Sequence, residues 1–115
     1  DFHAETTSEK VALGWYLDGR VSVVAGTHTH IQTADERITD KGTACITDLG
    51  MTGPYDSVIG REKESVIRKF LTQVGSIRGV PTGDVRLCGV IVAVDEITGR
   101  TTSIERIQKR LPPGA

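Results

Sequence analysis

Apolar positions along the chain fall into β-branched runs separated by segments with helical spacing. The run Val21–Ala25 is bounded by a charged residue and a glycine, and it predicts a buried strand. Four other stretches have extended character: residues 1–5, Thr43–Asp48, Asp84–Asp95 and Arg100–Arg110. The last two flank a short turn, so they predict an antiparallel hairpin.

Two segments have the periodicity of amphipathic helices. In the first, Glu9–Asp18, an apolar stripe includes Trp15. The preceding Thr6–Glu9 predicts a capping box, in which a threonine and a glutamate side chain bond the first turn of the helix. The second helix, Arg61–Thr72, places Phe70 on its apolar side, and we expect both aromatic residues to pack against a sheet. Strands alternating with helices predict an α/β fold.

The length of the chain and its first residue limit the number of domains that it can contain. A chain of 115 residues fits one domain. It begins in mid-pattern at Asp1 without a methionine, so we expect the amino-terminal half of the domain to be missing. Residues 1–111 would then form the carboxy-terminal portion of a single domain, with 112–115 as a tail.

Composition excludes several classes of protein. The net charge of −1 gives no sign of a nucleic-acid-binding surface. No apolar run approaches the roughly 20 residues that a membrane span needs. The two cysteines, Cys45 and Cys88, form neither a disulfide framework nor a thiol-rich zinc site, and we expect both to be buried small hydrophobes. We therefore expect a cytoplasmic protein with no membrane partner.

The three histidines are the candidate metal-ligating residues. His28 and His30 follow the buried strand Val21–Ala25, and positions i and i+2 of an extended segment point the same way. His3 lies at another predicted strand end, and a single helix between them would make the two strands parallel neighbours. Ligands of open α/β sheets bind at such carboxyl ends. The pattern therefore favours a metal site.

A structural interpretation of these residues stays open at this point. A His-x-His pair alone is about as often an ordinary loop as a metal site, and close divalent ions also need a bridging carboxylate. The acids near His3 are Asp1 and Glu5, and neither is clearly placed for that role. A glycine-punctuated loop after Asp48 raises the same choice. Thr52 could donate to a phosphate and Tyr55 could stack on a base, or the loop could be only a turn.

Three blocks of sequence resemble a known family. They are DFHAETTSEK over residues 1–10, GTHTHIQTADE over residues 26–36 and MTGPYDSVIG over residues 51–60. Gly-Thr-His-Thr-His resembles the last motif of the calcineurin-like metallophosphoesterases. The three blocks together are similar to one bacterial branch, the YmdB-like phosphodiesterases, and the resemblance runs almost from end to end of the chain.

The resemblance implies a fold and a metal centre. The fold is a four-layer αββα sandwich with mixed sheets, of which this chain holds part. The centre holds two metal ions, most often iron or manganese, with His30 on one ion and His28 and His3 on the other. The family's other ligands and its proton-transfer histidine come from earlier motifs that this chain lacks. The chain alone is therefore expected to be inactive.

The resemblance also implies a reaction. The complete protein would hydrolyse phosphodiesters, with 2′,3′- or 3′,5′-cyclic nucleotides as small-molecule substrates, by in-line attack of a metal-bridging hydroxide. A homo-oligomer is compatible with this prediction. The alternative is a truncated, non-catalytic module that binds a metal or regulates a partner. The sequence preceding Asp1 would discriminate between the two.

Overall fold

The computed structural model describes residues 1–114, which form two compact units. One unit comprises Asp1–Gly50 and Cys88–Ile107, and the other comprises Met51–Leu87 and the chain from Gln108 onward. Helices and sheets occur together, as the α/β prediction requires. The assignment of residues 1–111 to part of one domain stays a prediction. Neither helix in the described residues is long and apolar enough to cross a membrane.

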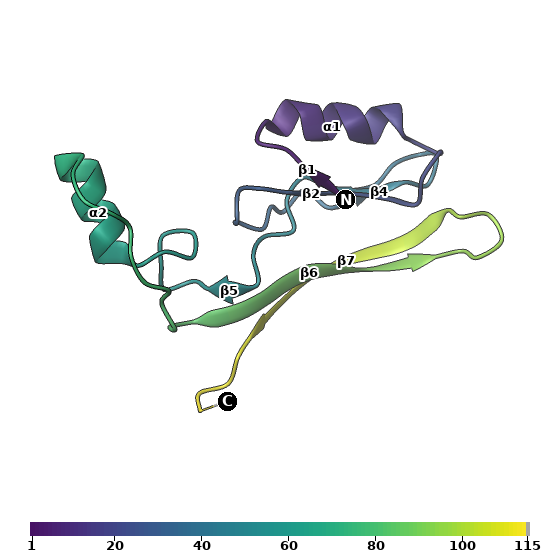
Figure 1. Ribbon diagram of the computed structural model, residues 1–115. Coiled ribbons are helices and arrows are strands. Elements are labelled where there is room, and N and C mark those ends of the chain that lie inside the picture. Colours follow the sequence, from purple (N-terminus) through teal and green to yellow (C-terminus); the bar gives the residue numbers. More distant parts are fainter. Residues whose placement is uncertain (115) are drawn as a thin grey trace. The chain divides into compact units, whose positions relative to one another are not determined.

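The first unit contains a four-stranded sheet in the order β1-β2-β4-β3 (Figure 1). The strands are β1 (Phe2–His3), β2 (Val23–Thr27), β3 (Arg37–Ile38) and β4 (Ala44–Ile46). β1 and β4 both pair with β2 in parallel, whereas β3 runs antiparallel to β4. The predicted parallel arrangement of the His3 strand and the Val21–Ala25 strand is therefore confirmed.

The first helix, α1 (Thr7–Tyr16), connects β1 to β2 and lies against the sheet (Figure 1). Gly14 is buried, and a Cβ there would lie 3.1 Å from the Cys45 sulfur, which shows how closely the helix approaches β4. Thr6 is the N-cap residue, but its side chain makes no capping hydrogen bond, so the predicted capping box is wrong. Trp15 is also not packed on the sheet as predicted. It is 55% exposed, and the Arg37 guanidinium lies 4.4 Å from its ring centre.

The core of the first unit is small and lies mainly in β2 and β4. All three residues of β4 are buried, as is Val24 of β2. Cys45 belongs to this core, as expected, whereas Cys88 is only half-buried. The buried polar residues include Lys10, Thr43 and Asp48.

The predicted hairpin is confirmed as β6 (Val85–Val94) and β7 (Thr101–Arg110). Its turn is closed by Asp95, whose carboxylate accepts hydrogen bonds from the Ile97 and Thr98 amides. A short strand that the sequence did not reveal, β5 (Gly53–Pro54), pairs antiparallel with the start of β6. The three strands form a second sheet in the order β5-β6-β7.

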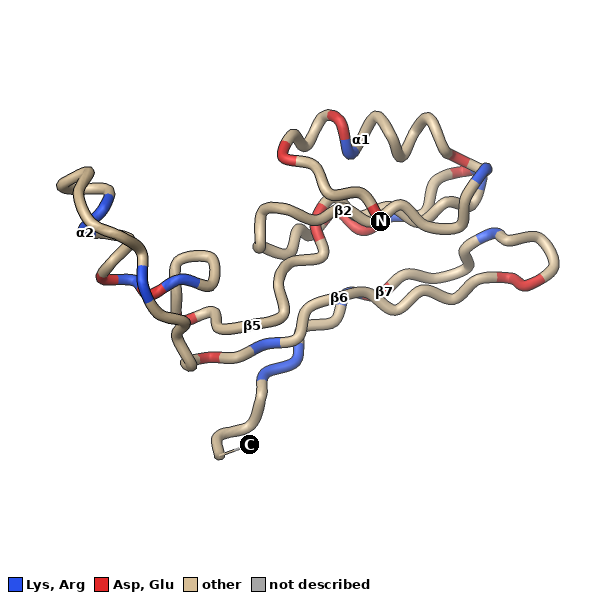
Figure 2. The backbone as a smooth tube through the Cα atoms, viewed as in Figure 1, with Lys and Arg blue, Asp and Glu red and all other residues tan. Residues whose placement is uncertain are grey.

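The second unit contains the helix α2 (Lys63–Thr72). Its N-terminus is capped by Glu62, whose side chain accepts hydrogen bonds from the Glu64 and Ser65 amides. Val66 is buried, but Phe70 is 75% exposed, so the predicted packing of Phe70 against a sheet is wrong. Figure 2 shows that this helix has an acidic position in its first turn and basic positions at its start and towards its end.

Candidate metal centre

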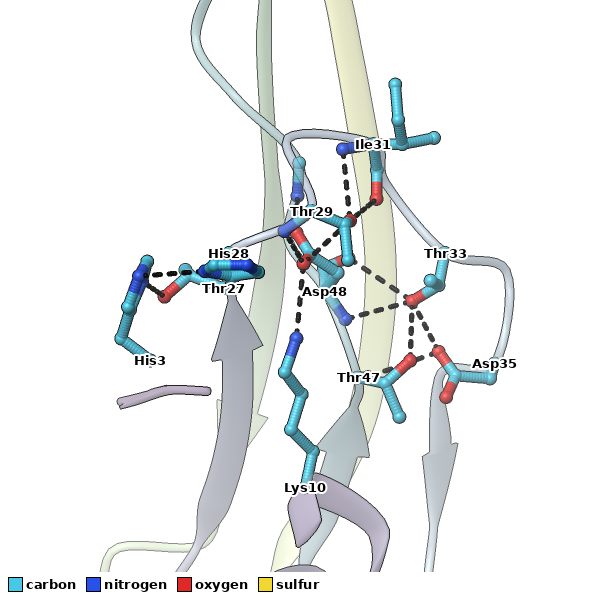
Figure 3. A network of polar contacts seen from close by, with 11 residues as sticks. His3, Lys10, Thr27, His28, Thr29, Ile31, Thr33, Asp35, Thr47 and Asp48 are labelled. Atoms are coloured by element: carbon cyan, nitrogen blue, oxygen red, sulfur yellow. Dashed lines mark hydrogen bonds and ion pairs between the residues drawn. The ribbon is translucent and has the colours of Figure 1, made fainter. Parts of the chain in front are cut away.

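The sheet topology places two of the three predicted histidines, His3 and His28, beside one another. His28 and His30 do not share an extended segment, so the prediction that their side chains point the same way for that reason is wrong. His3 is the last residue of β1 and pairs in register with Thr27, the last residue of β2. His28 follows β2 directly, and His30 follows two residues later. Because the two strands are parallel, their carboxyl ends meet at the same edge of the sheet. The imidazoles of His3 and His28 therefore come together, as Figure 3 shows.

The contact between these two rings is direct. Nδ1 of His28 lies 3.2 Å from Nε2 of His3, and the ring centres are 5.1 Å apart at an interplanar angle of 70°. The other nitrogen of His3, Nδ1, lies 3.0 Å from the Thr27 hydroxyl. Thr27 thus fixes the orientation of the His3 ring and leaves Nε2 directed at His28.

The two facing nitrogens lie at hydrogen-bond distance, and two ligands of one metal ion have a similar separation. Metal–nitrogen bonds of 2.0–2.1 Å at the tetrahedral angle place two ligand nitrogens about 3.3 Å apart. The nitrogens of His3 and His28 are 3.2 Å apart. Within residues 1–114, no group of three or more histidine, cysteine, aspartate or glutamate side chains is arranged to hold a metal ion. The metal-binding role of His3, His28 and His30 therefore stays a prediction.

The backbone around the two loop histidines is unusual. His28 has a φ of 135° and His30 a φ of 68°, both in the region that side-chain-bearing residues seldom occupy. Such conformations each cost of order 1–3 kcal/mol and persist only where surrounding contacts enforce them. They concentrate at functional sites, which makes the loop a candidate on grounds independent of histidine chemistry.

The contacts that enforce this loop come from Asp48, which follows β4. Its Oδ2 accepts hydrogen bonds from both the amide and the hydroxyl of Thr29, each at 2.8 Å. Lys10 of α1 donates to the same oxygen at 3.3 Å, and the Gly50 amide donates to Oδ1 at 2.9 Å. Burial would raise the pKa of Asp48, but these hydrogen bonds outweigh it and hold the pKa below its usual value. Asp48 is therefore ionised at neutral pH.

A second carboxylate anchors the far end of the loop. Asp35 accepts hydrogen bonds from the Thr33 hydroxyl at 2.6 Å and from the Thr47 amide at 3.2 Å. Although burial opposes the charge, contacts with Thr33 and Thr47 lower the pKa of Asp35. Thr33 also accepts from the Asp48 amide, so one network joins the loop to the end of β4 (Figure 3).

Sequence reasoning missed Lys10 and Asp48 as parts of this region. A lysine in an amphipathic helix usually indicates a solvated face, yet the Lys10 side chain is only 3% exposed and that of Asp48 only 1%. The partners are 38 positions apart, and nothing in the local pattern connects them. The one available signal was an aspartate at a strand end.

The two residues predicted to contact substrate, Thr52 and Tyr55, lie in the other unit. The Tyr55 hydroxyl donates to the Met51 carbonyl at 3.0 Å. The guanidinium of Arg86 lies 4.7 Å from the centre of the Tyr55 ring. The substrate-binding role of both residues stays a prediction.

Comparison with known proteins gives consistent matches. A 2′,3′-cyclic-nucleotide 2′-phosphodiesterase from Bacillus subtilis is 56% identical over 107 residues, which are 93% of this chain and 40% of the relative. The crystal structure of a phosphatase from Mycoplasma pneumoniae matches with a TM-score of 0.89 and 46% identity, over 96% of this chain and 40% of that one. A protein of known structure from Thermus thermophilus matches with a TM-score of 0.87 and 43% identity, over 96% of this chain and 43% of that one.

The chain thus spans about 40% of the length of the Bacillus subtilis relative. The model of one family, described as YmdB-like protein, matches residues 1–107. This range contains all three histidines and all three blocks on which the resemblance rests. The chain belongs to the YmdB-like protein family.

Proposed function

We propose that this chain supplies part of the active centre of a metal-dependent phosphodiesterase that hydrolyses cyclic nucleotides. The contact between His28 Nδ1 and His3 Nε2, at the carboxyl edge of a parallel strand pair, carries the proposal. The name of the Bacillus subtilis relative supports 2′,3′-cyclic nucleotides as the substrate class. The proposal includes a four-layer αββα sandwich with mixed sheets, completed by residues outside this chain.

The donor set fits metal ions of intermediate softness. We assign His3 and His28 to one ion and His30 to a second, with the remaining ligands supplied from outside this chain. Imidazole nitrogen suits iron, manganese and zinc, and added oxygen ligands favour the harder ions, which supports iron or manganese. When bound, two such ions lower the pKa of water and neutralise charge on the phosphoryl oxygens.

The residues of this chain would bind metal ions and substrate and would orient the histidine ligands. The Thr27 hydroxyl holds the His3 ring so that Nε2 stays directed toward His28. Asp48 holds Thr29 between the two loop histidines. Thr52 and Tyr55 are proposed to contact the phosphate and the base of the substrate.

The test uses the protein that carries this sequence, purified and supplied with Mn²⁺. Hydrolysis of bis(p-nitrophenyl) phosphate and of 2′,3′-cyclic AMP is measured for the unsubstituted protein and for His28→Ala. A matched control is Glu105→Ala, because Glu105 is exposed on β7. We expect His28→Ala to abolish hydrolysis while Glu105→Ala retains it.

Two outcomes would contradict the proposal. Full activity in His28→Ala would remove His28 from the metal centre. Mn²⁺ binding without hydrolysis of either substrate would instead favour a non-catalytic, metal-binding or regulatory module. That alternative draws on one observation, the absence among the described residues of a cluster with three metal-ligating side chains.

A further inference from the structure

We propose that Asp48 is a positioning residue for the loop that carries His28 and His30, and that it acts through Thr29. The inference rests on the proposed function only in taking these histidines as metal ligands. In the network of Figure 3 the carboxylate of Asp48 is directed at Thr29 and Lys10, and its other oxygen accepts a hydrogen bond from the Gly50 amide at the start of the next loop.

The geometry makes Thr29 the point at which the loop is held. Its amide and hydroxyl both donate to Asp48 Oδ2 at 2.8 Å. The same hydroxyl accepts a hydrogen bond from the Ile31 amide at 3.2 Å. The threonine oxygen thus links Asp48 to the amide of Ile31, and His30 lies between Thr29 and Ile31 in the chain. A displacement of Thr29 would therefore move the segment that carries His30.

The backbone conformation explains why such a hold is needed. His28 and His30 both have positive φ, and Thr29 lies between them. A segment with two unfavourable residues relaxes unless contacts outside it fix the conformation. The two bonds to Asp48 provide that constraint at the residue between the strained positions.

A carboxylate suits this position better than an amide. Oδ2 faces donors from Thr29 and Lys10, and Oδ1 faces the Gly50 amide, so both oxygens must accept. Asparagine has a single acceptor oxygen and would direct its NH₂ group at one of these donors. Lys10 neutralises the buried charge and contributes its donor from α1, so the helix also takes part in fixing the loop.

The test compares two isosteric threonine substitutions. Thr29→Val removes the hydroxyl that bonds Asp48 and Ile31, and it leaves the Lys10–Asp48 pair intact. The control Thr47→Val removes a hydroxyl from the same network that bonds Thr33 and Asp35 rather than Asp48 or Ile31. Thr29→Ser retains the hydroxyl and serves as the conservative rescue. Asp48→Asn is the more severe variant, because it also leaves Lys10 without its charge partner.

Two readouts decide the inference. The first is amide hydrogen exchange at residues 29–31, which we expect to be at least about tenfold faster in Thr29→Val and unchanged in Thr29→Ser and Thr47→Val. The second is Mn²⁺ affinity, which we expect to fall about tenfold or more in Thr29→Val alone. Equal exchange rates and equal Mn²⁺ affinities in Thr29→Val and Thr47→Val would overturn the positioning role.

The two proposals fail in different ways. An unsubstituted protein that binds no Mn²⁺ would contradict the metal centre, whereas the exchange rates at residues 29–31 would still decide whether Asp48 holds the loop. Normal Mn²⁺ binding with unaltered exchange in both Thr29→Val and Asp48→Asn would contradict the positioning role and leave the metal centre standing.

Discussion

A Cβ atom at Gly26 would lie 2.0 Å from the carbonyl oxygen of Thr47. The two residues lie at the ends of the neighbouring strands β2 and β4, and the Gly26 carbonyl accepts a hydrogen bond from the Leu49 amide at 2.9 Å. Backbone therefore lies in the space that any side chain would need. Gly26 begins the segment that carries His28 and His30, so this close approach sets where the histidine loop begins.

We predict that Gly26→Ala destabilises the protein by about 3 kcal/mol, since the backbone of Thr47 must shift to admit a methyl group. Urea unfolding followed by circular dichroism measures the loss. Gly89→Ala is the control, because nothing lies within 4 Å of a Cβ at that position. Equal free energies of unfolding for Gly26→Ala and Gly89→Ala would show that β2 and β4 can move apart without a loss of stability.

The Lys10–Asp48 pair leads to a second prediction. Lys10→Met retains much of the apolar stem of the side chain and leaves the carboxylate of Asp48 buried without its charge partner. Breaking a buried ion pair in this way costs about 3 kcal/mol or more, and we expect a loss of that size in the free energy of unfolding.

The control for this prediction is Lys63→Met. Lys63 pairs with Asp56, but both side chains are well exposed, at 44% and 60%. Solvent screens such a pair, so its removal should leave stability unchanged. Comparable losses of unfolding free energy in Lys10→Met and Lys63→Met would contradict the expectation that a buried ion pair costs more to break than an exposed one.

Glu62 provides a prediction about pH. Hydrogen bonds from Glu64 and Ser65 lower the pKa of Glu62 from 4.5 to about 2. Because the folded-state pKa is depressed, the stabilisation of α2 is fully present above pH 4.5 and is lost as the pH falls through about 2. A carbon-13 NMR titration of the carboxyl groups should give Glu62 a midpoint near 2.

A substitution tests the same cap. Glu62→Gln has one acceptor oxygen for the two amides, so it should lower the helicity of residues 63–72 at neutral pH. Glu105→Gln is the control, since Glu105 is exposed on β7 and lies outside this helix. Equal helicity in both variants would argue against capping by Glu62.

The Thr27 hydroxyl orients the His3 ring, which gives a fourth prediction. Thr27→Val removes the partner of Nδ1 and frees the ring to rotate away from His28. We expect Mn²⁺ affinity to fall about tenfold while the unfolding free energy changes little. Nitrogen-15 NMR of the imidazole rings should show an altered environment for His3. Unchanged affinity would mean that the strand register alone orients this ring.

Strand and helix patterns in the sequence were sufficient to place β1 beside β2. A β-branched run and a single intervening helix leave few ways to connect two strands, and the right-handed crossover makes them parallel. The meeting of His3 and His28 follows from that arrangement. The hairpin β6–β7 was equally clear, because two extended runs flank a turn that Asp95 closes.

Only the tertiary structure decided which side chains became buried. The helical pattern predicted that Trp15 packs against a sheet, yet Trp15 is 55% exposed, whereas Lys10 of the same helix is only 4% exposed. Lys10 can be buried because Asp48, from a distant strand end, neutralises its charge. Local periodicity contains no information about a partner 38 positions away. The sequence determined that His3 and His28 lie at the ends of neighbouring strands, and long-range electrostatics and packing decided what holds the loop of His28 and His30 in place.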